Sequence, residues 1–335
     1  MRVVRTVQAC REYRETLRAE ATRPPSVAVV MTMGALHAGH SSLIRSARAS
    51  STHLFVTLFV NPAQFGPQED LKRYPRTEDD DLRRCAQLGV DCVFAPDRVE
   101  EMYPPSRLGR WPTTVEVTCG RATHHRGSEG ASRPGFFVGV ATVVCKLLHI
   151  VQPDVAWFGA KDAQQCCIVR RMVRDLNMSV EVREAPTVRE PDGVALSSRN
   201  RYLTPAERAC APTIYEALRA GQEVWATRCA ECARDGRGLR RSDLCVVLQV
   251  VAQRLRQQPA LRVIYVSAAD VDEWTDWGTI LGEEDGLNAP VLTDRDEEIG
   301  EEVREVALCV AAWLGGARLI DNVRLMVPRA HPSEA

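Results

Sequence analysis

The chain has 335 residues, 45% of them apolar and 26% charged, and its length predicts two domains because single domains usually have roughly 100–200 residues. Its 43 basic and 44 acidic side chains give a formal net charge of −1, which argues against nucleic-acid binding driven by bulk electrostatics. No membrane-spanning segment is expected, since apolar stretches such as residues 54–60 are far shorter than the ~18 residues that span a bilayer.

The first half of the sequence alternates between strand-like and helix-like segments. The segment at 54–60 is apolar at almost every position, as expected for a buried parallel strand. Strands separated by crossover helices predict a Rossmann-like, doubly wound parallel α/β sheet, whose ligands collect at the carboxyl ends of strands. The expected strands are 27–31, 54–60, 91–95, 155–158 and one beginning at 180–182, and the expected helices are 41–50, 77–88 (with Thr77 as N-cap), 139–151 and 163–177.

The second half predicts a smaller α+β domain. Its expected helices are 204–228 and 241–257, around an Arg/Gly-rich loop at 235–240, and its apolar elements are 261–268, 306–314 and 317–320. A polar insert at 273–305 ends in an acidic run, to which no chemistry is assigned because such runs are usually solvated. The domain boundary falls within 186–192, which gives domains of residues 1–187 and 188–328 and a tail at 329–335.

The most informative motif is the run Met33-Gly34-Ala35-Leu36-His37-Ala38-Gly39-His40, between a strand-like segment and a helix-like one. Unpaired N–H groups and the helix dipole make a helix start an anion-binding site. The imidazoles of His37 and His40, three residues apart, can flank one phosphoryl group. A lone histidine would more often be structural, but the pattern His-x-Gly-His after a strand favours nucleotide chemistry.

Three further polar motifs stand where strands end or elements meet. Asn61 and Gln64 offer amides, which both donate and accept and so suit a hydroxy acid, although Asn-Pro also makes a simple turn. In the run 159–165, Lys161 can neutralise phosphate charge, although an exposed turn is the plainer interpretation. The loop 196–201 carries hydroxyls and guanidinium groups that suit a lid over a triphosphate, or else a solvated linker.

The twelve cysteines are scattered along the chain, and two of them, Cys166 and Cys167, are adjacent. This pattern predicts free thiols in a reducing, cytoplasmic setting rather than a disulfide framework. Cys229 and Cys232 have the spacing of half a zinc site, but no second pair accompanies them at a suitable spacing. No metal ligand is therefore assigned.

Together these motifs resemble the pantothenate synthetases, the family of pantoate–β-alanine ligases. The resemblance extends over nearly the whole chain, in the runs 32–40, 59–65, 72–77, 151–165, 186–203 and 318–322. It implies the nucleotidyltransferase-like Rossmann fold, related to the class I aminoacyl-tRNA synthetases. It also implies an AMP-forming carbon–nitrogen ligase of pantothenate and coenzyme A biosynthesis, acting as a cytoplasmic homodimer.

The implied reaction has two steps, with Mg²⁺ as cofactor. (R)-Pantoate and ATP give pantoyl adenylate and pyrophosphate, and β-alanine then displaces AMP. The first step needs no general base, because a carboxylic acid with a pKa of ~4 is already ionised at neutral pH. Its difficulty is an anion attacking a polyanion, so the site must supply donors and cations around the phosphates. No carboxylate stands out as the base that the amine of β-alanine requires.

The resemblance also implies which residues form the site. His40 matches the family's catalytic histidine, and His37 is expected to assist it. Gln64 and Gln165 match the glutamines that hold pantoate, with Gln64 also near β-alanine, and Asn61 is expected beside them. ATP contacts are implied at Met33, Gly34, Ala35, Leu36, His37, Ala38, Gly39, His40, Gly159, Ala160, Lys161, Asp162, Val188, Leu196, Ser197, Ser198 and Arg199.

The chain departs from the family pattern at several positions. Met31 replaces a usual proline, Ala160 a usual glutamate, and Phe136 and Val138 a common histidine and arginine. The insert at 273–305 is longer than in the compact bacterial form. Two alternatives stay open: a nucleotidyltransferase acting on a phosphate ester, which would share a similar histidine turn, and a non-catalytic nucleotide-binding protein, which the departures at 160, 136 and 138 would suit.

Overall fold

The computed structural model describes residues 1–20, 25–67, 69–107, 111, 113–118, 127–282, 296–300 and 302–328. The chain divides into two compact units. The first comprises the described residues of 1–117, 133–188 and 196–198, and the second those of 118–132, 189–195 and 199–335. The predicted domain boundary falls after residue 187, and the first-unit segment 133–188 ends one residue later. Residues 118–132 were predicted to belong to the first domain, whereas the described ones belong to the second unit. The predicted tail at 329–335 lies outside the described residues.

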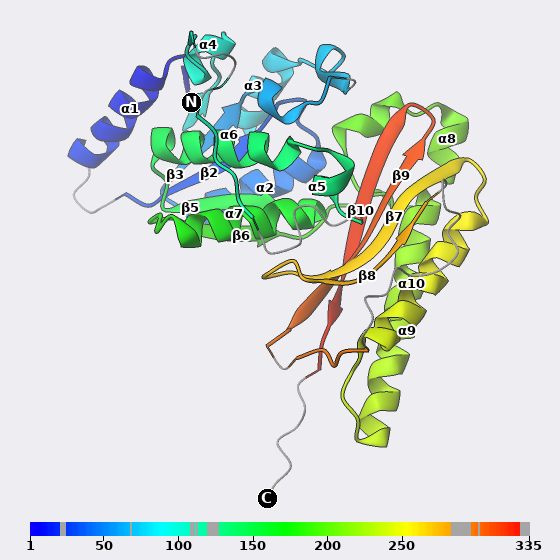
Figure 1. Cartoon of the computed structure of the whole chain (residues 1–335). Coiled ribbons are helices and arrows are strands. Elements are labelled where there is room, and N and C mark those ends of the chain that lie inside the picture. The colour runs from blue at the N-terminus through cyan, green and yellow to red at the C-terminus, as the bar shows by residue number, and fades with distance from the viewer. Residues whose placement is uncertain are drawn as a thin grey trace, which may run out of the picture. The chain divides into compact units, whose positions relative to one another are not determined.

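The first unit is built on a six-stranded parallel sheet with the strand order β1-β4-β3-β2-β5-β6 (Figure 1). The predicted parallel α/β sheet is thus confirmed. Its elements are β1 (Arg2–Val4), α1 (Val7–Glu20), β2 (Val27–Thr32), α2 (Ala38–Ala49), β3 (His53–Leu58), the short 3₁₀ helices η1 (Pro62–Gln64) and η2 (Asp70–Lys72), α3 (Glu78–Gln87), β4 (Cys92–Phe94), α4 (Val99–Met102), α6 (Phe136–Val151), β5 (Val155–Gly159), η4 (Ala160–Asp162), α7 (Ala163–Asp175) and β6 (Glu181–Ala185).

Both faces of this sheet are buried, which explains why β2 and β3 are apolar at successive positions. Val30 and Val56 pack with Ile44 of α2 in one cluster. The neighbouring position on β3, Phe55, points to the opposite face, where its ring lies 5.7 Å from that of Tyr13 on α1. The strand order reverses between β2 and β5, and in open α/β sheets ligands bind at such a switch point.

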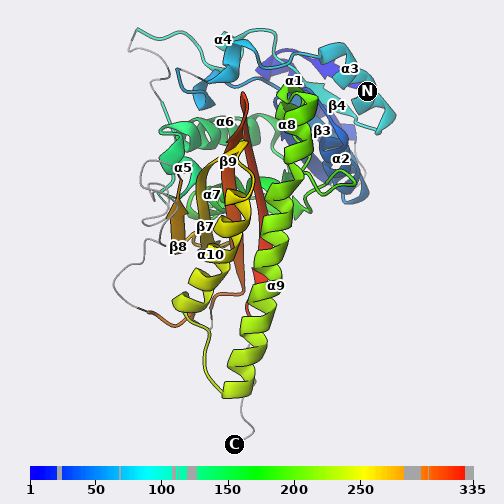
Figure 2. The ribbon, with the colours of Figure 1, turned by 90° about the vertical axis from the view of Figure 1, so that its right-hand side faces the viewer.

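The second unit contains a four-stranded antiparallel sheet with the order β10-β9-β7-β8. Helices α9 and α10 lie side by side on it, and leucines of α10 such as Leu248 pack with Val266 and Leu308 of the strands (Figure 2). Its elements are α5 (Glu129–Ser132), α8 (Pro205–Cys210), α9 (Pro212–Asp235), α10 (Arg241–Arg256), β7 (Leu261–Asp270), β8 (Asp276–Leu281), β9 (Glu305–Leu314) and β10 (Ala317–Met326), with η5 (Ser198–Tyr202) beginning in the first unit.

Two element predictions need correction. The helix expected over 204–228 is two helices, α8 and α9, because Pro212 has no N–H to continue the first and instead begins the second. The strand expected at 317–320 runs on to Met326, and β10 pairs with β9 along its whole length.

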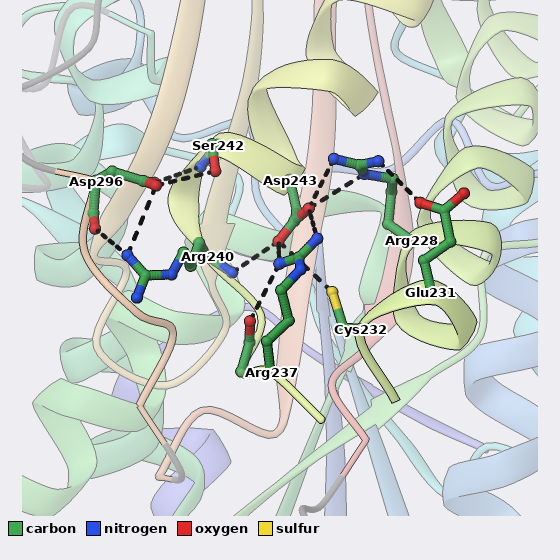
Figure 3. A network of polar contacts seen from close by, with 9 residues as sticks. Arg228, Glu231, Cys232, Arg237, Arg240, Ser242, Asp243 and Asp296 are labelled. Carbon is green, nitrogen blue, oxygen red and sulfur yellow. Dashed lines mark hydrogen bonds and ion pairs between the residues drawn. The ribbon is translucent and has the colours of Figure 1, made fainter. Parts of the chain in front are cut away.

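The insert predicted as polar at 273–305 contains the strand β8, in which Trp277 and Ile280 are buried. Part of its acidic run is exposed, as expected, but is also hydrogen-bonded to α10. Asp296 accepts hydrogen bonds from the backbone N–H (2.9 Å) and the hydroxyl (3.2 Å) of Ser242, at the start of α10 (Figure 3). The N–H groups of a helix start favour a carboxylate, so this residue caps α10. Arg241 donates its backbone N–H to the carbonyl of Glu297 (2.9 Å).

The cysteines that the structure describes are all free thiols, as predicted. Within the described ranges, no helix combines the length and the apolar character needed to cross a bilayer.

A buried ion pair fixes α5 in the second unit. The guanidinium of Arg318 donates two hydrogen bonds, each of 2.6 Å, to the carboxylate of Glu129. The phenol of Tyr265 donates a third, of 2.9 Å, to the same carboxylate. The side chains of Glu129 and Arg318 are only 9% and 14% exposed, so water compensates little for a lost partner.

We expect the substitution Glu129→Ala to lower the free energy of unfolding by about 3–5 kcal/mol, because it leaves the guanidinium of Arg318 without its carboxylate. Urea unfolding measures the change. The matched control is Glu181→Ala, which breaks an ion pair between exposed side chains, Glu181 and Arg183, and leaves the midpoint unchanged. Equal shifts in the two variants would contradict the prediction.

Candidate active site

The predicted histidine motif forms a tight turn between β2 and α2. Gly34 and Ala35 both adopt the left-handed conformation, with φ of +83° and +52°. Glycine reaches this region without steric cost, and a Cβ at position 34 would also lie 3.0 Å from Oδ2 of Asp81. The helix expected from Ser41 begins three residues earlier, at Ala38, because the side chain of His37 caps it.

The carboxylate of Asp81, on α3, holds this turn in place. Its Oδ2 accepts from the N–H of Ala35 (2.8 Å) and its Oδ1 from the N–H of Leu36 (2.7 Å). No sequence pattern indicates this role, because Asp81 is one of four consecutive acids in the first turn of a helix. Thr77 occupies the N-cap position of that helix, as predicted, but its hydroxyl donates to Oδ2 of Asp81 (3.2 Å) and makes no capping bond to the helix backbone.

The two histidines lie against each other, with ring centroids 4.1 Å apart. Nδ1 of His37 accepts from the N–H of Gly39 (3.2 Å), and Nδ1 of His40 accepts from the N–H of His37 (3.3 Å). A Cβ at position 39 would lie 2.9 Å from Cε1 of His37, so a glycine there allows the ring to approach. In its neutral form, a ring whose Nδ1 accepts a hydrogen bond carries its proton on Nε2. The turn therefore carries two neighbouring Nε2–H donors.

His40 is uncharged at neutral pH. Burial lowers the pKa of His40 to about 3, and repulsion from Arg84, Lys161 and, when it is protonated, His37 acts in the same direction. This imidazole can donate a hydrogen bond to a phosphate oxygen, but it supplies no full positive charge there. Net charge compensation must come from cations such as Lys161.

The amide motif after β3 (Asn61 and Gln64) contacts the histidine motif through Gln64. Asn61 is 1% exposed, and its Nδ2 donates to Oε1 of Gln64 (3.0 Å). The Nε2 of Gln64 in turn donates to Sδ of Met33 (3.2 Å), the first residue of the histidine motif. Because the amide of Asn61 is engaged within the protein, this geometry favours a role in holding Gln64 over direct contact with substrate.

The lysine motif follows β5, which pairs with β2 in the sheet. Gly159 ends the strand, and Lys161 and Asp162 lie partly exposed in η4. On the first turn of α7, Gln164 is buried but Gln165 is partly exposed, so Gln165 is the glutamine available to a ligand. The positive charge of Lys161 also contributes to the lowered pKa of His40.

The loop predicted as a lid is divided between the two units. The N–H of Leu196 donates to the carbonyl of Val188 (3.0 Å), and Oγ of Ser198 lies 3.4 Å from the phenol oxygen of Tyr74. A Cβ at position 39 would lie 3.8 Å from Cβ of Leu196, so this part of the loop reaches the histidine turn. Residues 196–198 belong to the first unit, whereas Arg199 begins the second, and its contact with ATP stays a prediction.

Phe136, which stands where the family commonly has a histidine, interacts with Arg133. The guanidinium of Arg133 stacks on the ring of Phe136, 3.5 Å from its centroid, and pairs with the carboxylate of Glu69 (2.7 Å). The aromatic ring thus helps hold the start of α6 to the loop that follows η1. Nothing in the structure explains the valine at position 138.

A helix start with two imidazole donors, at the switch point of a parallel sheet, is the arrangement expected of an ATP-using enzyme with the nucleotidyltransferase-like fold. Comparison with known proteins identifies the family, since the sequence model of the pantoate-beta-alanine ligases matches residues 2–324. The chain belongs to this family and is a ligase.

Individual relatives agree with this identification. The chain is 46% identical over 302 residues to the pantothenate synthetase of Salinispora arenicola, covering 90% of this chain and 92% of that one. The crystal structure of pantothenate synthetase from Thermus thermophilus superposes with a TM-score of 0.75 at 39% identity, covering 96% and 99% of the two chains. The pantoate-beta-alanine ligase of Francisella tularensis was solved with beta-gamma ATP and beta-alanine. It superposes with a TM-score of 0.68 at 27% identity, covering 96% of this chain and 97% of that one.

The lowered pKa of His40 predicts how stability depends on pH. The unfolded chain protonates this histidine near its ordinary pKa of 6.5, whereas the folded protein resists protonation down to about 3. The unfolded state therefore binds more protons in this window, and stability is lost as the pH falls below 6.5, by up to ~1.4 kcal/mol per pH unit.

We expect the variant His40→Gln to lose less stability than the parent between pH 7 and pH 5, as measured by urea unfolding. His149→Gln, which removes an exposed histidine, controls for the substitution itself. A parent and a His40→Gln variant with the same slope would show that His40 is not protected from protonation.

Proposed function

We propose that this chain condenses (R)-pantoate with β-alanine at the expense of ATP, through a pantoyl adenylate, with release of AMP and pyrophosphate. Membership of the pantoate-beta-alanine ligase family supports the overall reaction. The observation that carries the site assignment is the histidine turn, with its two Nε2–H donors beside the amide of Gln64.

In the first step, an ionised carboxylate oxygen of pantoate attacks the α-phosphorus of ATP, and the bond to the β-phosphate oxygen breaks. His37 and His40 donate their Nε2–H groups to α-phosphate oxygens, where negative charge accumulates. The N-terminal N–H groups of α2 add to this stabilisation. The side chains of Lys161 and Arg199 offset the charge of the leaving pyrophosphate.

The remaining contacts follow from the motifs around the turn. Gln64 and Gln165 hold pantoate, and Asn61 orients Gln64. Gln64 also lies beside β-alanine, whose amine attacks the adenylate carbonyl and expels AMP. No base is assigned to deprotonate this amine. The rate of the amine's attack then depends on the positioning of the two reactants, which can supply effective molarities of ~10⁵ M or more. ATP is held by residues 33–40, Gly159, Ala160, Lys161, Asp162, Val188, Leu196, Ser197, Ser198 and Arg199.

The proposed Mg²⁺ ion is assigned to the phosphate oxygens of ATP. Among the residues that the structure describes, no three His, Cys, Asp or Glu side chains gather into a metal site, so no protein ligand is named. A hard cation of this kind usually keeps several waters and binds mainly to nucleotide phosphates, where it neutralises charge. As the resemblance implies, we also propose that the enzyme is a cytoplasmic homodimer, which sedimentation equilibrium of the purified chain would test for its oligomeric state.

We expect His40→Ala to abolish adenylate formation without unfolding the protein, because it removes a donor that stabilises charge on the α-phosphate. Pantoate-dependent exchange of labelled pyrophosphate into ATP measures this step, with omission of pantoate as the blank. His53→Ala, at the start of β3, is the control and retains exchange. Near-normal exchange in His40→Ala would overturn the assignment.

We expect Gln64→Ala to raise the apparent KM for pantoate and for β-alanine by roughly tenfold or more, since one hydrogen bond to a charged group contributes ~1.5–3 kcal/mol. Steady-state AMP formation, with each substrate varied in turn, measures both constants. The control is Gln87→Ala, at an exposed position on α3. If both constants keep their parental values, Gln64 does not contact these substrates.

A further inference from the structure

Tyr103, which directly follows α4, carries a buried phenol next to the proposed pantoate site. The residue is 8% exposed. Its ring centroid lies 6.3 Å from that of Phe59 and 5.6 Å from that of Trp111. The phenol O–H donates to Oδ1 of Asn61 over 2.8 Å. Burial raises the pKa of Tyr103, so the phenol stays protonated and remains a donor.

The orientation of the Asn61 amide is dictated by the backbone. Its Oδ1 accepts from the N–H of Ala63 (3.3 Å), which can only donate. Its Nδ2 donates to the carbonyl of Gly139 (3.1 Å), which can only accept. An amide flipped by 180° would face a donor with a donor and an acceptor with an acceptor, so only one orientation is compatible with its surroundings.

The fixed orientation of the Asn61 amide also fixes the orientation of the Gln64 amide. The second hydrogen of the Asn61 Nδ2 points to the Gln64 side chain, so the atom that receives it must be the carbonyl oxygen Oε1. The NH₂ group of Gln64 is then left to face Sδ of Met33, 3.2 Å away. A thioether is a weak acceptor, and a substrate oxygen is a much stronger one.

We propose that Tyr103 is a positioning residue that holds Asn61, and through it Gln64, so that Gln64 offers an NH₂ donor to an oxygen acceptor of pantoate. The inference rests on the proposed contact between Gln64 and pantoate. It restricts the partner of Gln64 to an acceptor, a carboxylate or a hydroxyl lone pair, and it assigns Tyr103 a role in the affinity for the substrates that Gln64 contacts and none in the affinity for ATP.

The substitution Tyr103→Phe tests this role, because it keeps the ring between Phe59 and Trp111 and removes only the O–H. The Oδ1 of Asn61 then keeps the longer bond from Ala63 alone, and the amide is held less firmly. We expect the KM for pantoate to rise roughly five- to fifty-fold, the range that corresponds to a lost buried hydrogen bond of ~1–2.3 kcal/mol. The KM for ATP and kcat at saturating pantoate should change less than twofold.

A double-mutant cycle separates positioning from a general structural effect. If Tyr103 acts through Gln64, Tyr103→Phe changes the pantoate KM less than twofold when it is made in the Gln64→Ala background. Tyr265→Phe is the matched control, because it also removes a buried phenol hydrogen bond, the one to Glu129 (2.9 Å) in the second unit. This control should lower the thermal midpoint and leave the pantoate KM unchanged.

The outcomes are distinguishable. An unchanged pantoate KM in Gln64→Ala refutes the proposed site, and with it the inference. A raised KM in Gln64→Ala but not in Tyr103→Phe refutes the inference alone, as does an equal effect of Tyr103→Phe in both backgrounds. An equal rise of the KM values for pantoate and ATP would show that Tyr103 stabilises the fold and does not orient Gln64.

Discussion

The pair of hydrogen bonds from the turn after β2 to the carboxylate of Asp81 is the constraint on which the candidate site depends. Two consecutive residues, Gly34 and Ala35, adopt the left-handed conformation there, and the N–H groups of Ala35 and Leu36 would otherwise lack a buried acceptor. The carboxylate compensates this strain and fixes the backbone just before α2. That backbone in turn sets the tautomers of His37 and His40, because each Nδ1 accepts from an N–H of the turn.

The same principle recurs on the other side of the site, where backbone groups of Ala63 and Gly139 orient Asn61. In both places a main-chain donor or acceptor, which has no alternative role, decides which end of a side chain faces the ligand. Chemistry on phosphates and carboxylates requires donors, and the proposed site offers donors whose orientation is fixed by the backbone. In the proposed mechanism, positive charge is left to the longer side chains of Lys161 and Arg199, which can follow the departing pyrophosphate.

The sequence predicted the parallel sheet and the location of the motifs well, because these depend on local patterns. The apolar run at 54–60 and the glycine-bearing turn at 33–40 are signals of this kind. Asp81 and Tyr103 were missed because their roles arise from pairings over 40 or more residues, and an acidic helix turn or a tyrosine before proline is common in proteins without any such pairing. The strand β8 was missed because the acids around it dominate the composition of the segment, although Trp277 and Ile280 point into a core. The break before Pro212 was readable from the missing N–H alone.

The buried free cysteines can report local opening of the folded protein. Burial raises the pKa of Cys10, Cys85 and Cys92 in the first unit, and of Cys309 in the second, to about 12, so thiolate is almost absent while the protein is folded. Alkylating reagents and oxidants, which react with thiolates, are therefore excluded by both access and ionisation. Each of these sulfurs becomes reactive only when the layer that covers it opens. The positions labelled during brief exposure to an alkylating reagent would thus distinguish opening of the parallel sheet from opening of the antiparallel one.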